Sequence, residues 1–458
     1  MLNWIWLGFI LVAVFVGGWN GKLPQMTGGA FETAESAVMK IALPLVGLMA
    51  IWLGIMRLAE RSGLVQLIAR ALRPLMRRLF PEVPRDHPAM GAMVMNMAAN
   101  MLGLGNAATP LGLRAMSHLE RLNPAPGTAT NAMCTFLAVN TASIQLVPTT
   151  AISLLAVAGS KNPTAIVLTA FLATCCSALS GVAAVKLLEN LPFFRIATKP
   201  APAAADSIPA GETEETLAVE EVTAAPLSIF GRGVVTLFFA GFGVLFLGLA
   251  FPDALNALLG AFPGNLRAAA APAELADKGP LLRSLLTLSI LAVPMMLSFF
   301  PLYAALRGVK VYEQFVEGAK EAFGVAQRIV PFLVAMLIAM RMLREAGVID
   351  LVTQKLTPLL NALHFPADLL PMVLMRPLSG SATQGIFVEL IHRLGPDTLV
   401  SRMAATVYGS TETTFYVLAV YFGSVGVRKT RHAVLAGLTA DTVAVIASVA
   451  LCRVFFGA

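Results

Sequence analysis

A group of polar side chains interrupts an otherwise apolar part of the sequence, MVMNMAANMLGLGNAATPLGLRAM. Its members are Asn96, Asn100, Asn106 and Thr109, with Gly103, Gly105 and Pro110 among them. Amides at membrane depth are costly unless they are paired or face water. With glycine and proline beside them, they are typical of a broken or re-entrant helix that binds a solute. Packing of small residues between helices, cross-linked by the amides, is the alternative.

A second group, LMRPLSGSATQGIF, combines a fixed positive charge with helix-breaking residues. Its side chains are Arg376, Ser379, Ser381 and Gln384. Arg376 has two interpretations of equal weight: it binds an anionic group of a substrate, or it is the structural partner of Glu412.

Each group is followed by a further polar segment, TNAMCTFLAVNTASIQLVPTT in one case and YGSTETTFYVLAVYFGS in the other. The candidate binding residues there are Asn140, Thr141, Ser410, Thr411, Glu412 and Thr413. Glu412 is an acid in an apolar context, which indicates a functional site, and a carboxylate there is suited to coupling transport to H⁺ or Na⁺. Asp441 is the second candidate for ion coupling, although an ion pair with a neighbouring basic residue explains it as well.

Motifs of enzymes are missing from the sequence. It has no P-loop, no G-x-S-x-G, no dinucleotide fingerprint and no metal-ligand spacing among its histidines and cysteines. The SGS at 379–381 lacks a histidine placed for a triad. We therefore expect no catalytic residue, no metal and no cofactor.

The composition of the chain indicates whether these residues lie in water or within a membrane. The chain is 57% hydrophobic and 13% charged, with a mean hydropathy of +0.76, whereas soluble domains carry about 25% charged residues. We predict an all-α, polytopic membrane protein. The net charge of +7 comes from basic clusters beside apolar segments, which is typical of cytoplasmic loops and not of nucleic-acid binding. Apolar spans are expected near 2–18, 38–58, 136–158, 163–190, 228–251, 284–306, 325–343, 411–426 and 432–456.

A change in composition divides the chain. Residues 195–226 contain four prolines and six acids but almost no bulky apolar side chains, so the segment cannot bury enough surface to order itself. We predict a flexible acidic linker at 193–227 between two membrane halves, 1–192 and 228–458. Residues 252–283 are rich in proline and are expected to form a loop outside the membrane.

The two halves share a repeated segment. MRLAERSGLVQLIARALRPL begins at Met56 and MRMLREAGVIDLVTQKLTPL begins at Met340. A short polar segment and two apolar spans follow each copy, so we predict an internal duplication.

The charges predict that the repeats are inverted. Residues 57–85 carry seven arginines, whereas the equivalent stretch near 344–366 mixes signs, and the bias swaps between the last two spans of each half. Because basic loops stay cytoplasmic, we expect 57–85, 195–226 and 427–432 in the cytoplasm. Residues 252–283 and 344–366 are expected outside.

Several long motifs resemble one family. FPEVPRDHPAMGAMVMNMAANMLGLGNAATPLGLRAM and NAMCTFLAVNTASIQLVPTT are similar to spore maturation protein A. VYEQFVEGAKEAF, LMRPLSGSATQGI and YGSTETTFYVLAVYFGSVGVRKTRHA are similar to spore maturation protein B. The chain resembles a fusion of the two, in which each membrane half contains a nucleoside recognition or gate domain. The resemblance implies a transporter-like, multi-pass protein of the bacterial plasma (inner) membrane but fixes no substrate.

From these observations we predict a secondary carrier that binds a small polar or anionic solute, with a nucleoside-like solute as one candidate. Its expected partners are the solute, H⁺ or Na⁺ as coupling ion, and the lipid bilayer, while homo-oligomer formation is left open. The alternatives are a non-transporting scaffold or an envelope or spore-maturation factor, and a lipid-handling membrane protein.

Overall fold

The computed structural model of the chain describes residues 2–194, 225–259, 275, 278–349, 351, 355, 358, 360, 362 and 364–457. The regular structure of these residues is helical, and none of them forms a β-strand. The predicted all-α class is therefore confirmed.

The first half of the chain has long helices at both ends of a group of short ones. α2 (Leu23–Ser36), the π-helical turn η1 (Ala37–Ala42) and α3 (Leu43–Arg61) form one continuous helix. The other elements are α1 (Leu2–Trp19), α4 (Leu64–Leu79), α5 (Pro88–Met101), α6 (Gly105–Arg121), α7 (Asn131–Ala142), α8 (Thr149–Val157), η2 (Pro163–Ile166), α9 (Val167–Leu188) and η3 (Pro192–Phe194).

The second half repeats this order of elements after additional helices at its start. In both halves a long helix, a pair of short helices, a helix broken in two and a final long helix follow one another. The elements are α10 (Ile229–Ala250), α11 (Pro252–Leu259), α13 (Pro280–Leu306), α14 (Val311–Glu345), η4 (Ala367–Leu369), α16 (Leu370–Met375), α17 (Gly380–Leu394), α18 (Leu399–Ser410), α19 (Thr414–Ser424) and α20 (Ala433–Phe456).

Six helices within the described residues are long and apolar enough to cross a membrane. They are Leu23–Arg61, Pro163–Leu188, Ile229–Ala250, Pro280–Leu306, Val311–Glu345 and Ala433–Phe456. Each coincides with an apolar span expected from the sequence. The expected span at 2–18 forms α1, which contains a shorter apolar helix, Trp6–Trp19.

Two expected spans are not single membrane-crossing helices. The span at 136–158 is wrong as a continuous helix, because Ser143 adopts a left-handed backbone with φ 44° and α8 starts only after Pro148. The span at 411–426 contributes only the 11-residue α19, which is about half the length that a bilayer requires. Both segments are thus parts of broken helices.

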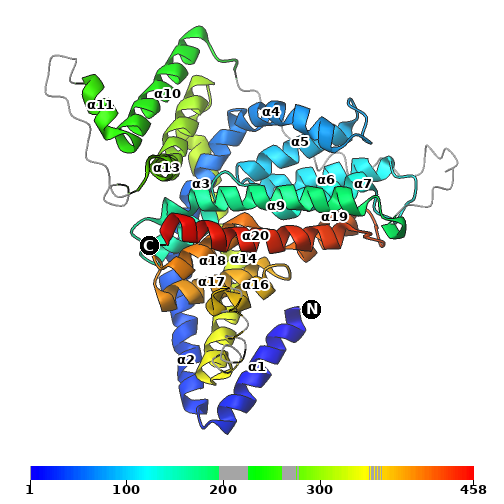
Figure 1. Ribbon diagram of the computed structural model, residues 1–458, viewed down its shortest axis with the longest axis vertical. Coiled ribbons are helices and arrows are strands. Elements are labelled where there is room, and N and C mark those ends of the chain that lie inside the picture. Colours follow the sequence, from blue (N-terminus) through cyan, green and yellow to red (C-terminus); the bar gives the residue numbers. More distant parts are fainter. Residues whose placement is uncertain are drawn as a thin grey trace.

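The long helices of the two halves pack in antiparallel pairs (Figure 1). Along α9 and α20, the Ser177 hydroxyl donates to the carbonyl oxygen of Ala440, while Thr169 contacts Cys452. The α2–α3 helix pairs with α14 in the same way, since Gly54 lies against Phe315 and Gly29 lies against Arg341. These pairs hold the short and broken helices of the two halves together.

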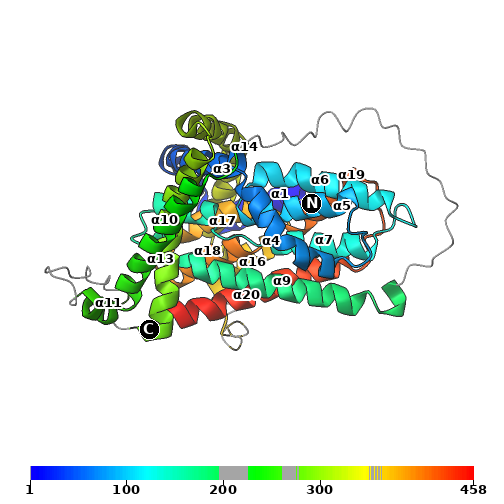
Figure 2. The ribbon, with the colours of Figure 1, turned by 90° about the horizontal axis from the view of Figure 1, so that it is seen from above.

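Apolar side chains cover much of the outer surface of the helix bundle. α10 and α13 lie side by side at one edge of the molecule (Figure 2), and Ile229, Phe230 and Leu237 of α10 are largely exposed. An exposed apolar surface of this kind requires a lipid environment. The chain is therefore a multi-pass membrane protein.

The described parts of the predicted loops lie at two ends of the bundle. At one end Glu82 accepts a hydrogen bond from Asn131, and Arg431 donates to Asn131. At the other end Asp397 accepts from Ser160 and Lys161. Residues 195–224 of the predicted linker and most of the expected loops at 252–283 and 344–366 lie outside the described residues.

Candidate functional site

The breaks of the two broken helices meet in the interior. The main-chain N–H of Glu412, which lies between α18 and α19, donates to the carbonyl oxygen of Thr141 in the last turn of α7 at 3.0 Å. In return Pro148, which precedes α8, lies against Gly409 of α18, where a Cβ atom would be only 2.6 Å from Cβ of Pro148. Each break is therefore packed against the broken helix of the other half.

A threonine of α9 secures the first break. The hydroxyl of Thr174 donates to the carbonyl oxygens of Ala142 at 2.6 Å and Ser143 at 3.1 Å. Carbonyl groups at the C-terminal end of a helix have no partner within the helix, so Thr174 satisfies two groups that the break releases. Sequence reasoning missed this residue because it lies in an uninterrupted apolar run.

Arg376 secures the second break. Its Nε donates to Thr411 Oγ1 at 2.8 Å, and its Nη2 donates to the carbonyl oxygens of Tyr408 at 3.1 Å and of Thr411. Nη1 lies 3.5 Å from Thr413 Oγ1, and the guanidinium stacks over the Tyr408 ring at 4.9 Å. The buried arginine is thus engaged with the backbone and hydroxyls of the α18–α19 connection.

The ion pair suggested between Arg376 and Glu412 is not formed in the part of the chain that the structure describes. Glu412 is half-buried, and its carboxylate accepts a hydrogen bond from the N–H of Thr413 at 3.3 Å. The partner suggested for Arg376 is thus replaced by hydroxyls and backbone carbonyls of the α18–α19 connection, and binding of an anionic solute by Arg376 stays a prediction.

Three asparagines of the first half make hydrogen bonds in the interior, two of them with each other. Asn100 Nδ2 donates to Asn140 Oδ1 at 3.0 Å, and Asn140 Nδ2 donates to the carbonyl oxygen of Phe136 at 2.8 Å. Asn96 Nδ2 donates to the carbonyl oxygen of Ala108 and lies 3.5 Å from the hydroxyl of Tyr421 in α19. Tyr421 was missed in the sequence, where it reads as an apolar side chain of a span.

Asp441 of α20 lies beside the meeting point of the breaks. Its Oδ2 accepts a hydrogen bond from Thr414 Oγ1 at 2.6 Å, and its Oδ1 has no partner among the described residues. A Cβ atom on Gly437, one turn earlier, would contact both Thr414 and Thr141. The ion pair considered for Asp441 is therefore replaced by a hydroxyl contact.

The serines of the second half lie at helix ends. Ser379 Oγ accepts from the N–H of Ala382 and so caps α17, and it lies 3.4 Å from the half-buried Ser381. Ser410 contacts Ser448 of α20 at 3.2 Å. Gln384 is buried in α17, and its Nε2 has no partner within the described part of the chain.

Two predicted site residues of α6 complete the set. Thr109 is half-buried, whereas the side chain of Asn106 lies outside the described residues. The predicted residues thus come from both broken helices, both pairs of short helices and α20. Contacts through Glu412, Thr141 and Tyr421 link the two halves.

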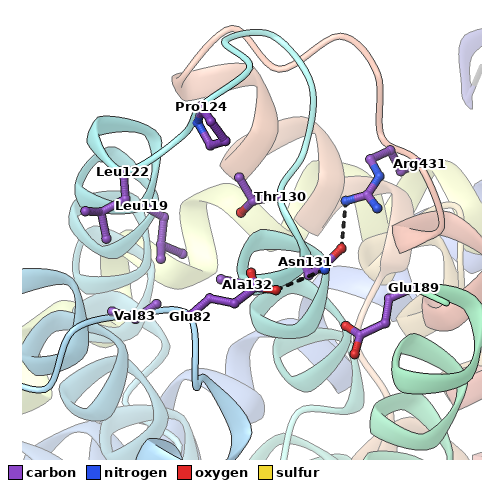
Figure 3. Close-up of a pocket in the computed structure, with 10 residues that line it drawn as sticks. All are labelled: Glu82, Val83, Leu119, Leu122, Pro124, Thr130, Asn131, Ala132, Glu189 and Arg431. Carbon is purple, nitrogen blue, oxygen red and sulfur yellow. Dashed lines mark hydrogen bonds between the residues drawn. The ribbon is translucent and has the colours of Figure 1, made fainter. Parts of the chain in front are cut away.

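A cavity of about 450 Å³ lies at the end of the bundle where loops of both halves meet (Figure 3). Arg431 lies in its wall. Its guanidinium donates hydrogen bonds to the carbonyl oxygens of Ala129 and Phe194 and to Asn131 Oδ1 at 2.8 Å. Asn131 in turn donates to Glu82 Oε1 at 3.0 Å. The Arg431 guanidinium is thus already bonded to protein groups. The cavity lies at one end of the bundle, apart from the central site.

Comparisons with known proteins agree with this architecture. Residues 42–189 and 326–428 match the Gate family, described as nucleoside recognition. Spore maturation protein A of Bacillus subtilis (strain 168) is 42% identical over 195 residues, which are 43% of this chain and 97% of that protein. Spore maturation protein B of the same organism is 41% identical over 170 residues, which are 37% of this chain and 96% of that protein. The chain therefore belongs to the Gate (nucleoside recognition) family.

Proposed function

We propose that this protein is a secondary carrier, and not an enzyme, that moves a small polar or anionic solute across the bacterial plasma membrane. The observation that carries the proposal is a set of buried polar atoms on the broken helix α7 and on helices that pack against the broken helices. Within the described residues Asn96 Oδ1, Thr141 Oγ1, Gln384 Nε2 and Asp441 Oδ1 have no hydrogen-bond partner. A buried polar group without a partner is destabilising, so a bound solute, ion or water would satisfy these atoms.

The proposal includes two inverted repeats. In support, the equivalent long helices α3 and α14, and likewise α9 and α20, pack antiparallel to one another. Repeats related by a two-fold axis in the membrane plane place equivalent helices in opposite directions. The short pairs α5–α6 and α16–α17 would then be re-entrant hairpins that reach the central site from opposite sides, since none of these helices is long enough to span.

Glu412 and Asp441 are the acids that we assign to ion coupling. Both lie where the breaks meet, and Asp441 is buried on α20, where it accepts a hydrogen bond from the hydroxyl of Thr414. A carboxylate in such a place exchanges H⁺ or binds Na⁺ as the solute binds. A nucleoside-like solute is compatible with the amides of Asn96, Asn100 and Gln384, since amides both donate to and accept from ring atoms and hydroxyls.

A non-transporting role in envelope or spore maturation is the second candidate, and the names of the two relatives favour it. In that case the polar network would only fix the packing of the helices. A lipid-handling role is a further alternative.

Transport by proteoliposomes tests the proposal. The full chain is reconstituted and offered labelled nucleosides, nucleobases and small carboxylates, with and without gradients of H⁺ or Na⁺. Gradient-dependent uptake that Asp441→Asn abolishes, and that Glu313→Gln on the exposed first turn of α14 leaves unchanged, supports a carrier. If no solute is taken up and none raises the melting temperature of the protein, the carrier proposal is wrong.

A further inference from the structure

A charged side chain lies inside the longest apolar helix of the chain. Within the continuous helix Leu23–Arg61, residues 37–42 form a π-helical turn, in which the N–H of Leu43 bonds to the carbonyl oxygen of Val38, five residues earlier. Such turns are rare and often mark functional sites. Lys40 lies in this turn between Met39 and Ile41. A lysine in an apolar membrane helix is costly unless it meets an anion or a polar surface.

This turn borders a cavity that is separate from the central site. The cavity has a volume of about 460 Å³ and lies between the α2–η1 segment, α14 and α17. Its wall contains both apolar and charged side chains. It is lined by Glu32, Thr33, Ser36, Ala37, Lys40, Ile41, Leu337, Arg341, Arg344, Glu389, His392 and Arg393.

Two of the basic residues in the wall are neutralised by ion pairs. The Glu389 carboxylate lies 2.9 Å from Arg344 Nη2 and 3.4 Å from Arg393 Nε. Arg393 also contacts Asp368 at 2.6 Å. This chain of pairs places the cavity at a polar boundary of the bundle and leaves neither arginine with an unbalanced charge.

The other two basic residues of the wall, Lys40 and Arg341, differ in their partners. Lys40 has no carboxylate within ion-pair distance in the residues that the structure describes, and Arg341 shares its charge with Glu345 at 2.9 Å. Among the four basic side chains in the wall, Lys40 is therefore the one that has no ion-pair partner within the described residues. Arg341 is also held against the α2 helix, because a Cβ atom on Gly29 would lie 3.2 Å from its Nε. Lys40 can therefore bind an anionic group, such as a phosphate, in the cavity whose wall it shares with Arg341.

The surface beside the cavity is suited to acyl chains. Val38, Met39 and Leu43 lie on the same turns of the helix as Lys40, and their exposed fractions are 40%, 58% and 62%. A ligand that fits both the basic cavity wall and the apolar helix surface beside it carries a phosphate anion and long apolar chains. We propose that this cavity binds the headgroup of an anionic phospholipid from the surrounding leaflet, with its phosphate on Lys40 and Arg341. This inference does not depend on the transport function.

Native mass spectrometry and thermal shift of the full-length protein in detergent test this proposal. The probes are short-chain phosphatidylglycerol, short-chain phosphatidylcholine and inorganic phosphate. Phosphatidylglycerol should bind and raise the melting temperature, while the other two should have much smaller effects. Lys40→Gln and Arg341→Gln should each weaken phosphatidylglycerol binding by about tenfold, as expected for the loss of one charge-assisted contact.

Matched variants separate binding from folding. Lys40→Arg keeps the charge and should bind lipid as the natural protein does, and Lys22→Gln removes an exposed lysine outside the cavity and should also leave binding unchanged. The melting temperature without lipid shows that each variant is folded. Equal stabilisation by phosphatidylcholine or by inorganic phosphate overturns the proposal, as does unchanged phosphatidylglycerol binding in both Lys40→Gln and Arg341→Gln.

Discussion

The N–H of Glu412 donates a hydrogen bond to the carbonyl oxygen of Thr141 at 3.0 Å, so the backbone break of one half is bonded to the broken helix of the other. The Thr141 carbonyl belongs to the last turn of α7, where the helix supplies no N–H donor of its own. The bond therefore satisfies a backbone group from each half at once. Any rearrangement that separates the two breaks must replace it, by water or by solute.

Arg376→Gln should destabilise the protein by about 2 kcal/mol or more, because it removes the bonds that hold Thr411 and the Tyr408 carbonyl in a buried place. Glu412→Gln should leave stability near that of the natural protein, since its carboxylate accepts only a weak hydrogen bond from Thr413. The measurement is chemical or thermal unfolding in detergent.

The double variant distinguishes this arrangement from a structural ion pair. Because no Arg376–Glu412 contact is formed in the described structure, adding Glu412→Gln should not restore the stability that Arg376→Gln loses. Recovery of most of the loss in the double variant would show that the two residues are paired in the membrane.

Glu412→Gln should instead change function. If Glu412 couples solute movement to an ion, the variant should fold normally and bind solute but lose the dependence of uptake on the H⁺ or Na⁺ gradient. Uptake in proteoliposomes with the gradient applied or collapsed measures this. Glu313→Gln, on the exposed first turn of α14, is the matched control. An unchanged gradient dependence in Glu412→Gln would remove Glu412 from the coupling site.

The membrane class and most spans were predictable because they depend on local composition. Runs such as 228–251 and 432–456 are predominantly apolar, and helices form there in the structure. The polar residues of the second break were also visible, since the TET at 411–413 stands in an apolar context. The span at 136–158 was predicted as continuous because its average hydropathy hides the single turn where Ser143 leaves the helix.

The partners of the site residues were not predictable, because they depend on which helices pack together. Thr174 bonds to Ala142, and Tyr421 approaches Asn96 from the other half of the chain. Neither residue stands out in sequence. The partners of Arg376 were misjudged for a related reason: charge alone favoured Glu412, but the extended backbone at Thr411 places a carbonyl and a hydroxyl within reach of the guanidinium.

Gly318→Ala should destabilise the α3–α14 pair. A Cβ atom at Gly318 would lie 2.6 Å from the carbonyl oxygen of Leu53 and 2.6 Å from Cβ of Arg57, so the two helices would have to separate. The expected loss is about 1–3 kcal/mol. Gly47→Ala on α3 is the control, since nothing lies within 4 Å of its Cβ position, and unfolding curves compare the two. Equal stability of both variants would contradict the close packing described for this pair.

Asp397 should stabilise the protein in a pH-dependent way. Partial burial by itself raises the pKa of this carboxyl, but hydrogen bonds from the Lys161 N–H and the Ser160 hydroxyl and the charge of Arg402 outweigh it, so the pKa lies below its usual value. Because the folded pKa is depressed, the stabilisation is present above the unfolded pKa of about 4 and is lost as the pH falls through the folded pKa.

Asp397→Asn is the matched substitution for this test. The natural protein should melt at a higher temperature than the variant at pH 7, and the difference should shrink below about pH 4. A constant difference from pH 7 to pH 3 would show that the charge of Asp397 does not matter.

The inverted topology predicts which residues face each side of the membrane. In the structure Glu82 and Arg431 are joined through Asn131 at one end of the bundle, and α9 leads from that end to the end where Asp397 meets Ser160. At about 1.5 Å per residue, the 22 residues of α9 are long enough to cross a bilayer of about 30 Å.

Single cysteines in a cysteine-free background decide this. Cysteines at the exposed positions Arg85 and Lys429 should react with an impermeant thiol reagent only from the cytoplasmic side, and cysteines at Lys161 and Asp253 only from outside. A permeant reagent should label all four, which shows that each position is accessible. Because Arg85 follows the first long span of one half and Lys429 precedes the last span of the other, labelling of these two from opposite sides would exclude inverted repeats.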